Sequence, residues 1–206
     1  MKKIIIILFL LTTCIFAQRE TVFESEIDNG GFGGPVVKMT QVKGNFGVIV
    51  GGYGGWLINH QFLLGGGGFG LANDIEAGKE VTGIPGSLNR PMLNFGYGGL
   101  ILEYYFNPMK LIHYSVSLLI GGGGISYRER HFMEGSGSNA DLDELYNPDA
   151  FFVVEPAVSG ELNVAKFMKI GLGVGYRWTT GVNMVGINNS DLSNFSVNLA
   201  LKFGKF

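Results

Sequence analysis

A strict two-residue alternation of apolar and small or polar residues is the feature that most constrains the fold of this 206-residue sequence. It is clearest at residues 168–179. One set of positions holds Met168, Ile170, Leu172, Val174, Tyr176 and Trp178, and the other holds Lys169, Gly171, Gly173, Gly175, Arg177 and Thr179. Successive residues of a β-strand point to opposite faces of a sheet, so the pattern predicts a strand with one apolar face.

Eight such strands are predicted, at residues 35–43, 45–57, 62–73, 92–106, 111–127, 151–164, 168–180 and 194–203. Most of them match the roughly nine to eleven residues of a tilted strand that crosses a bilayer. After the first hairpin, short connections (58–61, 107–110, 165–167) alternate with long polar ones (74–91, 128–150, 181–193). In an up-and-down sheet all the long loops then lie at one end, as in bacterial outer-membrane barrels with short periplasmic turns. The sequence therefore predicts an all-β fold, an eight-stranded antiparallel up-and-down transmembrane β-barrel. A secreted soluble β-barrel or sandwich with an apolar core is the alternative.

Aromatic residues lie near the ends of these strands, as expected for the aromatic girdles of a membrane barrel. At the short-turn end the pattern places Trp56, Tyr104, Tyr105, Phe106, Tyr114 and Phe203, and at the long-loop end Phe69, Phe95, Tyr97, Phe152, Tyr176 and Trp178.

In architecture the chain resembles the small OmpA/OmpX-type outer-membrane barrels over residues 35–206. The resemblance implies a location in the bacterial outer membrane, contact with its lipid, and recognition by the barrel-assembly machinery through a C-terminal aromatic residue. Phe206 is out of phase with the residues from Phe195 to Phe203, so Phe203 is the other candidate for that role.

The N-terminus has the pattern of a secretory signal peptide at residues 1–17. Two lysines precede an apolar run, and Ala17 predicts cleavage before Gln18; a lipoprotein signal ending at Cys14 is the alternative. Residues 18–34 are then expected to form a periplasmic segment before the barrel. Because Cys14 is the one cysteine, the mature chain has none for a disulfide or a thiolate site.

Glycine is abundant, with 34 residues that cluster inside the second to fifth predicted strands. Glycine weakens a strand, so such clusters require a reason. We expect them to ease curvature and leave space for larger neighbours in a narrow barrel. A local bulge or cavity that admits a ligand is the competing interpretation.

The polar faces of the last three strands carry charges that a barrel would enclose. The pattern predicts lipid contact for Ile170, Leu172, Val174, Val197, Leu199 and Leu201, and a lumen position for Glu155, Glu161, Lys169, Arg177 and Lys202. A three-residue turn at 165–167 would place Val164 opposite Met168 and Glu155 opposite Arg177, which predicts an enclosed ion pair. A bulge at Pro156 would alter this pairing.

No enzyme, cofactor or metal site is predicted. His113 and Ser115 have the spacing of an outer-membrane deacylase family but lie at the end opposite the outer leaflet, with no evident acidic partner. The acidic residues Asp141, Asp143, Glu144 and Asp149 do not fit a calcium loop. A formal net charge of −2 gives no basic footprint for nucleic acid. Three roles remain: a structural or surface-interaction barrel with a filled lumen, whose surface partner the sequence does not name, a conduit for a small apolar molecule, and a soluble ligand-binding protein.

Overall fold

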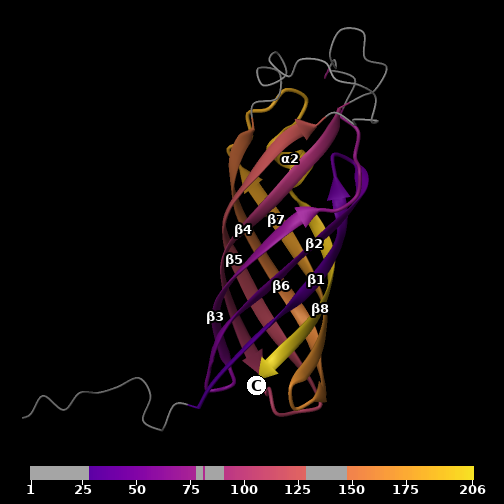
Figure 1. The fold of residues 1–206 in the computed structure, drawn as a ribbon. Coiled ribbons are helices and arrows are strands. Elements are labelled where there is room, and N and C mark those ends of the chain that lie inside the picture. The colour runs from indigo at the N-terminus through magenta and orange to yellow at the C-terminus, as the bar shows by residue number, and fades with distance from the viewer. Residues whose placement is uncertain (1–27, 78–80, 82–90, 129–147) are drawn as a thin grey trace, which may run out of the picture.

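The alternating segments form one closed antiparallel barrel in which neighbours in the chain are neighbours in the sheet (Figure 1). The computed structural model describes residues 28–77, 81, 91–128 and 148–206. The strands are β1 (Asn29–Val42), β2 (Asn45–Ile58), β3 (Phe62–Leu71), β4 (Met92–Phe106), β5 (Ile112–Arg128), β6 (Asp149–Ala165), β7 (Met168–Thr180) and β8 (Asn194–Lys205), with a short helix, α2 (Asn189–Leu192), before β8. The predicted fold class and strand count are confirmed.

The two faces of each strand are those that the alternation predicts. Leu172 and Val174 of β7 are exposed on the outer wall, whereas the intervening Gly173 is buried. The other predicted lipid-facing residues, Ile170, Val197, Leu199 and Leu201, also lie on the outer face, exposed or half-buried. An apolar outer wall is the arrangement expected of a membrane barrel and not of a soluble one.

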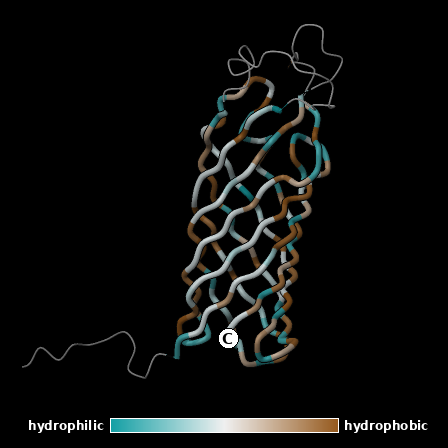
Figure 2. The backbone as a smooth tube through the Cα atoms, viewed as in Figure 1, coloured by the Kyte–Doolittle hydropathy of each residue, from teal (hydrophilic) through white to brown (hydrophobic). Residues whose placement is uncertain are grey.

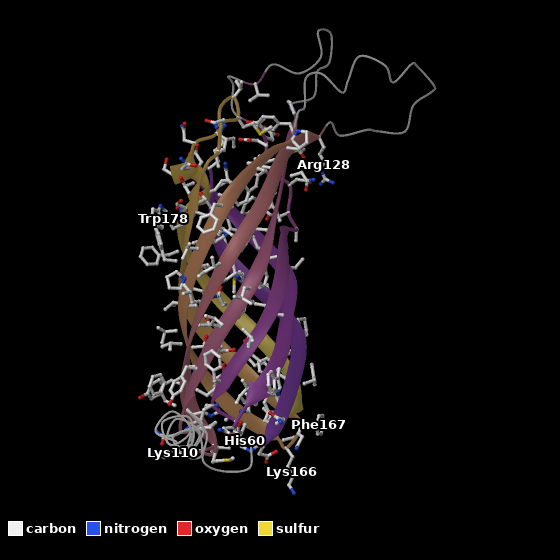
Figure 3. All side chains as sticks on the ribbon, turned by 90° about the vertical axis from the view of Figure 1, so that its left-hand side faces the viewer. His60, Lys110, Arg128, Lys166, Phe167 and Trp178 are labelled. Carbon is white, nitrogen blue, oxygen red and sulfur yellow. The ribbon has the colours of Figure 1, made fainter. Side chains whose placement is uncertain are left out.

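The ends of the barrel differ as predicted. The turns after β2, β4 and β6 lie at the end that also holds Phe206, which we call the short-turn end; α2 and the described residues of the long connections lie at the opposite end, the long-loop end. Figure 3 places His60, Lys110 and Lys166 at the former and Arg128 at the latter. The β1–β2 hairpin turns at the long-loop end through Lys43 and Gly44, which have φ of 50° and 73°. Positive φ at both central residues is typical of the tightest hairpin turns. Within the described residues, no helix is long and apolar enough to cross a membrane.

The first strand begins earlier than predicted. β1 starts at Asn29 instead of residue 35, and Gly30 and Gly33 pair with Leu57 and Gly54 of β2. Residues 29–34, which we expected before the barrel, therefore belong to it. The sequence hid this extension because a glycine-rich stretch shows no alternation of side chains. The predicted signal peptide lies outside the described residues.

Most of the predicted register between β6 and β7 is confirmed. Asn163 pairs with Lys169 as expected, but Ala165, not Val164, lies opposite Met168, because the register shifts just before the turn. At Pro156 the ladder omits two pairs yet resumes in the same register, from Val154–Trp178 to Ala157–Gly175. Proline has no N–H to donate, so it interrupts the ladder here without a bulge.

The glycines form a continuous band across β2–β5, which is the pale front wall in Figure 2. Cross-strand pairs such as Gly52–Gly68, Gly68–Gly98 and Gly98–Gly122 join them from strand to strand. Inward glycines leave room for neighbouring side chains. A Cβ at Gly171 would approach Glu161 Oε1 to 3.1 Å, and one at Gly123 would meet the ring of Phe151. This agrees with the predicted role of making space in a narrow barrel.

Candidate functional site

The lumen is the part of the barrel where polar side chains converge. Alternation turns one residue in two inward, and the buried polar residues come from β1, β4, β5, β6, β7 and β8: Lys38, Thr40, Glu103, His113, Ser115, Glu155, Glu161, Lys169, Arg177, Thr179, Ser196, Asn198 and Lys202. All five charges predicted to face the lumen are among them. Buried charges must be paired, so the partners of these groups decide how the lumen is filled.

One ion pair crosses the lumen at mid-height. Lys38 Nζ lies 2.6 Å from Glu155 Oε1, and Tyr97 donates a 2.6 Å hydrogen bond to the other carboxylate oxygen. Lys38 Nζ also lies 3.6 Å from the centre of the Phe69 ring, which adds a cation–π contact. We name Lys38, Tyr97 and Glu155 the upper network.

The predicted ion pair between Glu155 and Arg177 is wrong. Both side chains are buried, but the carboxylate of Glu155 forms its ion pair with Lys38. The Arg177 guanidinium instead donates from Nε to the carbonyl oxygen of Leu192 at 2.7 Å and stacks against the Phe95 ring, 5.0 Å from its centre. Strand register predicts contacts between adjacent strands only, whereas in a narrow lumen a side chain of β1 reaches one of β6 directly.

A second network lies nearer the short-turn end. Lys202 Nζ is 2.6 Å from Glu161 Oε1 and 3.0 Å from Glu103 Oε1, and all three side chains are nearly inaccessible to solvent. Tyr53, Tyr105 and Ser115 donate further hydrogen bonds to Glu103, at 2.9, 2.7 and 2.8 Å. These residues are the lower network. Glu161 and Lys202, which were both predicted to lie in the lumen, belong to this network.

Lys38 and Glu103 are the functional residues that the sequence argument missed. Each is the one charged residue in an otherwise uncharged strand, at an inward position. A charged side chain in a membrane-crossing strand is costly on the lipid face. A single charged residue in such a strand therefore indicates a lumen position, and this was the signal available in the sequence.

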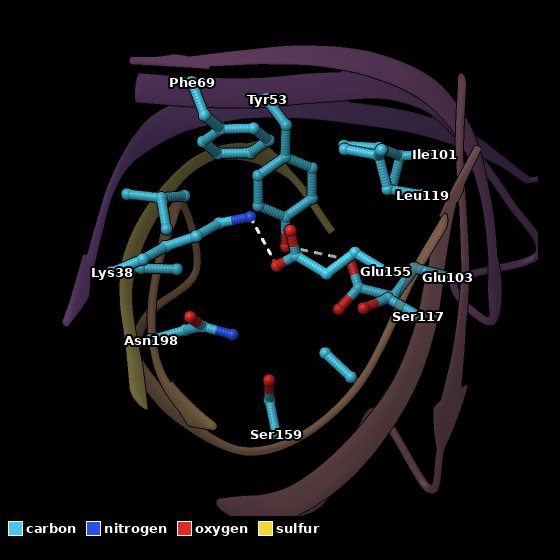
Figure 4. Close-up of a pocket in the computed structure, with 13 residues that line it drawn as sticks. Lys38, Tyr53, Phe69, Ile101, Glu103, Ser117, Leu119, Glu155, Ser159 and Asn198 are labelled. Carbon is cyan, nitrogen blue, oxygen red and sulfur yellow. Dashed lines mark hydrogen bonds and ion pairs between the residues drawn. The ribbon is translucent and has the colours of Figure 1, made fainter. Parts of the chain in front are cut away.

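A small cavity of about 60 Å³, lined by both polar and apolar side chains, separates the two networks (Figure 4). Lys38, Glu103 and Glu155 border it, with Ser159 and Asn198 on another side of the lumen. The Oδ1 atom of Asn198 is buried without a hydrogen-bond partner. The space holds a few water molecules at most, which would satisfy such an acceptor, and is too small for an organic ligand.

The long-loop half of the lumen is packed with apolar side chains. Phe95, Ile125, Phe151 and Val153 pack there with Ile187 and Leu192 of the last connection. That connection folds over the barrel end, and Lys43 N–H donates to the Asp191 carbonyl oxygen at 2.8 Å. Apolar packing therefore closes this half of the lumen.

The residues predicted for the aromatic girdles lie on both faces of the wall. Trp56, Tyr104, Tyr114, Tyr176, Trp178 and Phe203 are exposed on the outer wall. Tyr105 was placed wrongly: it is buried in the lumen, where it donates to Glu103. Consecutive strand residues face opposite sides, so only one of Tyr104 and Tyr105 can face lipid. Phe69, Phe95 and Tyr97 likewise point inward.

The arrangement gives no support for catalysis at His113. Ser115 donates to Glu103 and Glu161, whereas His113 Nδ1 faces the Lys110 carbonyl oxygen at 3.2 Å. Nucleophile and base are thus not joined. Among the described residues, no three His, Cys, Asp or Glu side chains are grouped so as to hold a metal ion. Asp141, Asp143 and Glu144 lie outside that part of the chain.

Comparisons with known proteins agree with this architecture. No protein-family model and no curated protein matches the sequence. Among solved structures, Neisserial surface protein A aligns with 13% identity and a TM-score of 0.51, over 88% of this chain and all of that one. The attachment invasion locus protein of Yersinia pestis, in complex with the heparin analogue sucrose octasulfate, aligns with 10% identity and a TM-score of 0.50, over 88% of this chain and 100% of that chain. The N-terminal β-barrel domain of Pseudomonas aeruginosa OprF has a TM-score of 0.49 at 9% identity, over 87% and 99% of the two chains. The chain therefore has the fold of small outer-membrane β-barrels of the OmpA/OmpX type.

Proposed function

We propose that this protein is a bacterial outer-membrane barrel with a structural or surface-interaction role and no catalytic activity. The observation that carries the proposal is the filled lumen. Two ion-pair networks cross it, apolar side chains pack its long-loop half, and about 60 Å³ remains between the networks. A barrel filled in this way acts through its surfaces and not through its interior.

An outer-membrane location is supported by the outer wall. Its apolar band is bordered by aromatic residues toward both ends, and lipid would surround those side chains. Phe203 faces outward at the short-turn end, whereas the ring of Phe206 stacks on Phe32 at 5.3 Å. This favours Phe203 over Phe206 as the aromatic residue offered to the barrel-assembly machinery.

A surface partner would meet an acidic end. The connections 74–91, 128–150 and 181–193 contain ten acidic and four basic residues. The Yersinia protein was solved with a polyanion, sucrose octasulfate. An acidic surface repels polyanions, so we propose a cationic partner for this chain instead.

The alternative role, a conduit for a small apolar molecule, requires an opening along the lumen. The cavity seen there, of about 60 Å³, is too small for such a molecule. Reconstitution into liposomes tests the difference. We expect heat-modifiable gel mobility, recovery in the outer-membrane fraction, and no swelling of liposomes in isosmotic solutions of small sugars. Swelling, or conductance steps in a planar bilayer, would contradict the filled lumen.

A further inference from the structure

The short-turn end contains a pocket that neither network uses. It has a volume of about 360 Å³, which is within the range of small-ligand sites. Its lining includes His60, Met109, Asn163, Lys166, Lys169 and Phe206, from the turns after β2, β4 and β6 and the neighbouring strand ends. The pocket thus opens on the side that faces the periplasm in a barrel of this orientation.

Lys169 is the buried lysine of this pocket, and among the described residues its ammonium group has no ion-pair partner. Its side chain is buried, and its Nζ lies 4.4 Å from the ring centre of Phe206 and 5.2 Å from that of Tyr105. Lys38 and Lys202 both have carboxylate partners. Among the described residues, Lys169 Nζ makes neither an ion pair nor a hydrogen bond. On the neighbouring strand β6, Glu161 binds Lys202 and Ser115 through Oε1, and its buried Oε2 has no hydrogen-bond partner among the described residues.

Two buried polar atoms in the pocket also have no hydrogen-bond partner among the described residues. Asn163 donates its amide N–H groups to the carbonyl oxygens of Pro108 and Lys110, which leaves its buried Oδ1 unsatisfied. His60 Nε2 lies 3.0 Å from Asp28 Oδ2, and its buried Nδ1 has no partner. Hydrogen bonds from Lys205 and His60 lower the pKa of Asp28, so its carboxylate only accepts. In a neutral His60 ring, assigned the tautomer that donates to Asp28, Nδ1 is then an acceptor.

We propose that this pocket binds the C-terminal carboxylate of a peptide or of an N-acyl amino acid. The carboxylate would bind to Lys169, with Lys166 adding positive charge at the exposed edge. The amide N–H next to such a carboxylate is a donor for Asn163 Oδ1 or His60 Nδ1. Met109, Ala165 and Phe206 offer apolar contacts to a small side chain. One ligand class thus supplies both an anion and a donor.

The test uses the full chain folded in lipid nanodiscs with ¹³C-methyl methionine. Met109 lines the pocket, whereas Met39 on the outer wall is an internal reference. We expect N-acetyl-alanyl-alanine to shift the Met109 methyl signal in a saturable way. Its C-terminal amide should bind at least about tenfold more weakly, because it lacks the charge-assisted hydrogen bond to Lys169. Butanoate, a carboxylate with no amide, should also bind more weakly.

Variants distinguish binding in the pocket from non-specific attraction of the ligand to positive charge. Lys169→Gln should weaken binding about tenfold, and Lys169→Arg should retain it if the charge is what the ligand needs. Lys110→Gln removes a charge from the turn that carries Met109, at a side chain that does not line the pocket, and should bind like the unchanged chain. Heat-modifiable mobility verifies the fold of each variant. Equal binding of the amide, equal binding of inorganic phosphate, no saturable shift, or equal loss in the Lys110 variant would overturn the proposal.

Discussion

At the scale of single residues, the lumen charges are held by contacts between distant parts of the chain. Lys38 and Glu155 are 117 positions apart, and Lys202 and Glu103 are 99 apart. In each network tyrosine hydroxyls complete the hydrogen bonding of the carboxylate. A buried carboxylate with both oxygens bound is stable only while each partner remains, so removing one partner is more harmful than removing the pair.

The first prediction concerns Lys38 and Glu155. Lys38→Met or Glu155→Gln alone should lower the free energy of unfolding by about 3–5 kcal/mol, because each leaves a buried charge unpaired. The double variant should lose less than the sum. Urea unfolding in liposomes gives the coupling energy by a double-mutant cycle. The exposed pair Arg128–Asp74 is the control, with coupling of about 0–1 kcal/mol. Additive effects at Lys38 and Glu155 would show that the pair is solvated.

The second prediction uses two consecutive tyrosines. Tyr105→Phe removes the hydroxyl that donates to Glu103 and accepts from Lys202, and should cost about 1–3 kcal/mol. Tyr104→Phe changes the outward ring and should alter the free energy of unfolding by less than about 0.5 kcal/mol. Thermal or urea unfolding of both variants in the same lipid decides this. Equal effects would mean that Tyr105 is not part of the lower network.

At the scale of strands, the glycine band brings backbones closer than side chains allow. A Cβ at Gly99 would collide with the Ile120 carbonyl group and Gly121 Cα on β5, whereas a Cβ at Gly68 would meet nothing within 4 Å. Gly99 is on the inner face and Gly68 is exposed on the outer one, but a Cβ at the outward-facing Gly54 or Gly98 would also collide with backbone atoms. The close approach of the strands in this wall thus depends on glycines such as Gly99.

The third prediction compares these two positions. Gly99→Ala should destabilise the barrel by about 1–3 kcal/mol, because backbone atoms cannot move aside as a flexible side chain would. Gly68→Ala should be neutral or stabilising by up to about 1 kcal/mol, since alanine loses less backbone entropy on folding. Equilibrium unfolding in urea measures both. Tolerance of alanine at Gly99 would imply that β4 and β5 can separate at no cost.

Alternation predicted the strand count, the two ends and the facing of most residues, because a period of two reports directly on the side of a sheet. It could not find the start of β1, since Gly30, Gly31, Gly33 and Gly34 carry no side chains to alternate. Nor could it pair Lys38 with Glu155. Contacts across a lumen depend on strand tilt and stagger, which no single strand encodes. Tyr105 was misplaced because a girdle was inferred from composition near strand ends without the parity of each position.

At the scale of the whole molecule, the outer wall is matched to hydrocarbon and the lumen is not. Leu172, Val174 and Leu199 are exposed on the outer face of β7 and β8, while Lys169, Arg177 and Lys202 occupy the inner face of the same strands. A single sheet thus separates two dielectric environments, and each position tolerates only one kind of side chain.

The fourth prediction tests this separation. Val174→Arg should cost about 2–4 kcal/mol if the residue is near the bilayer midplane, and Leu199→Arg should behave alike. A lipid-soluble thiol reagent should label cysteines at positions 174 and 199 but not at 173 and 198. Refolding yields and unfolding in liposomes measure the cost of the arginine substitutions. Mass spectrometry measures the labelling of the cysteines. The reverse labelling pattern would invert the assignment of the faces.

Closure of the ring has a consequence for how the chain folds. β1 pairs with β8 from Gly31–Lys205 to Thr40–Ser196. Both edges of the first strand in the chain are therefore hydrogen-bonded only after the last strand has formed. Contacts that join such distant segments form slowly. Until then the free edges can pair with other chains, and hydrocarbon does not tolerate their unbonded N–H and C=O groups. Entry of strands into the bilayer one at a time is therefore unfavourable, and we expect insertion and closure of the seam to occur as one late, concerted event.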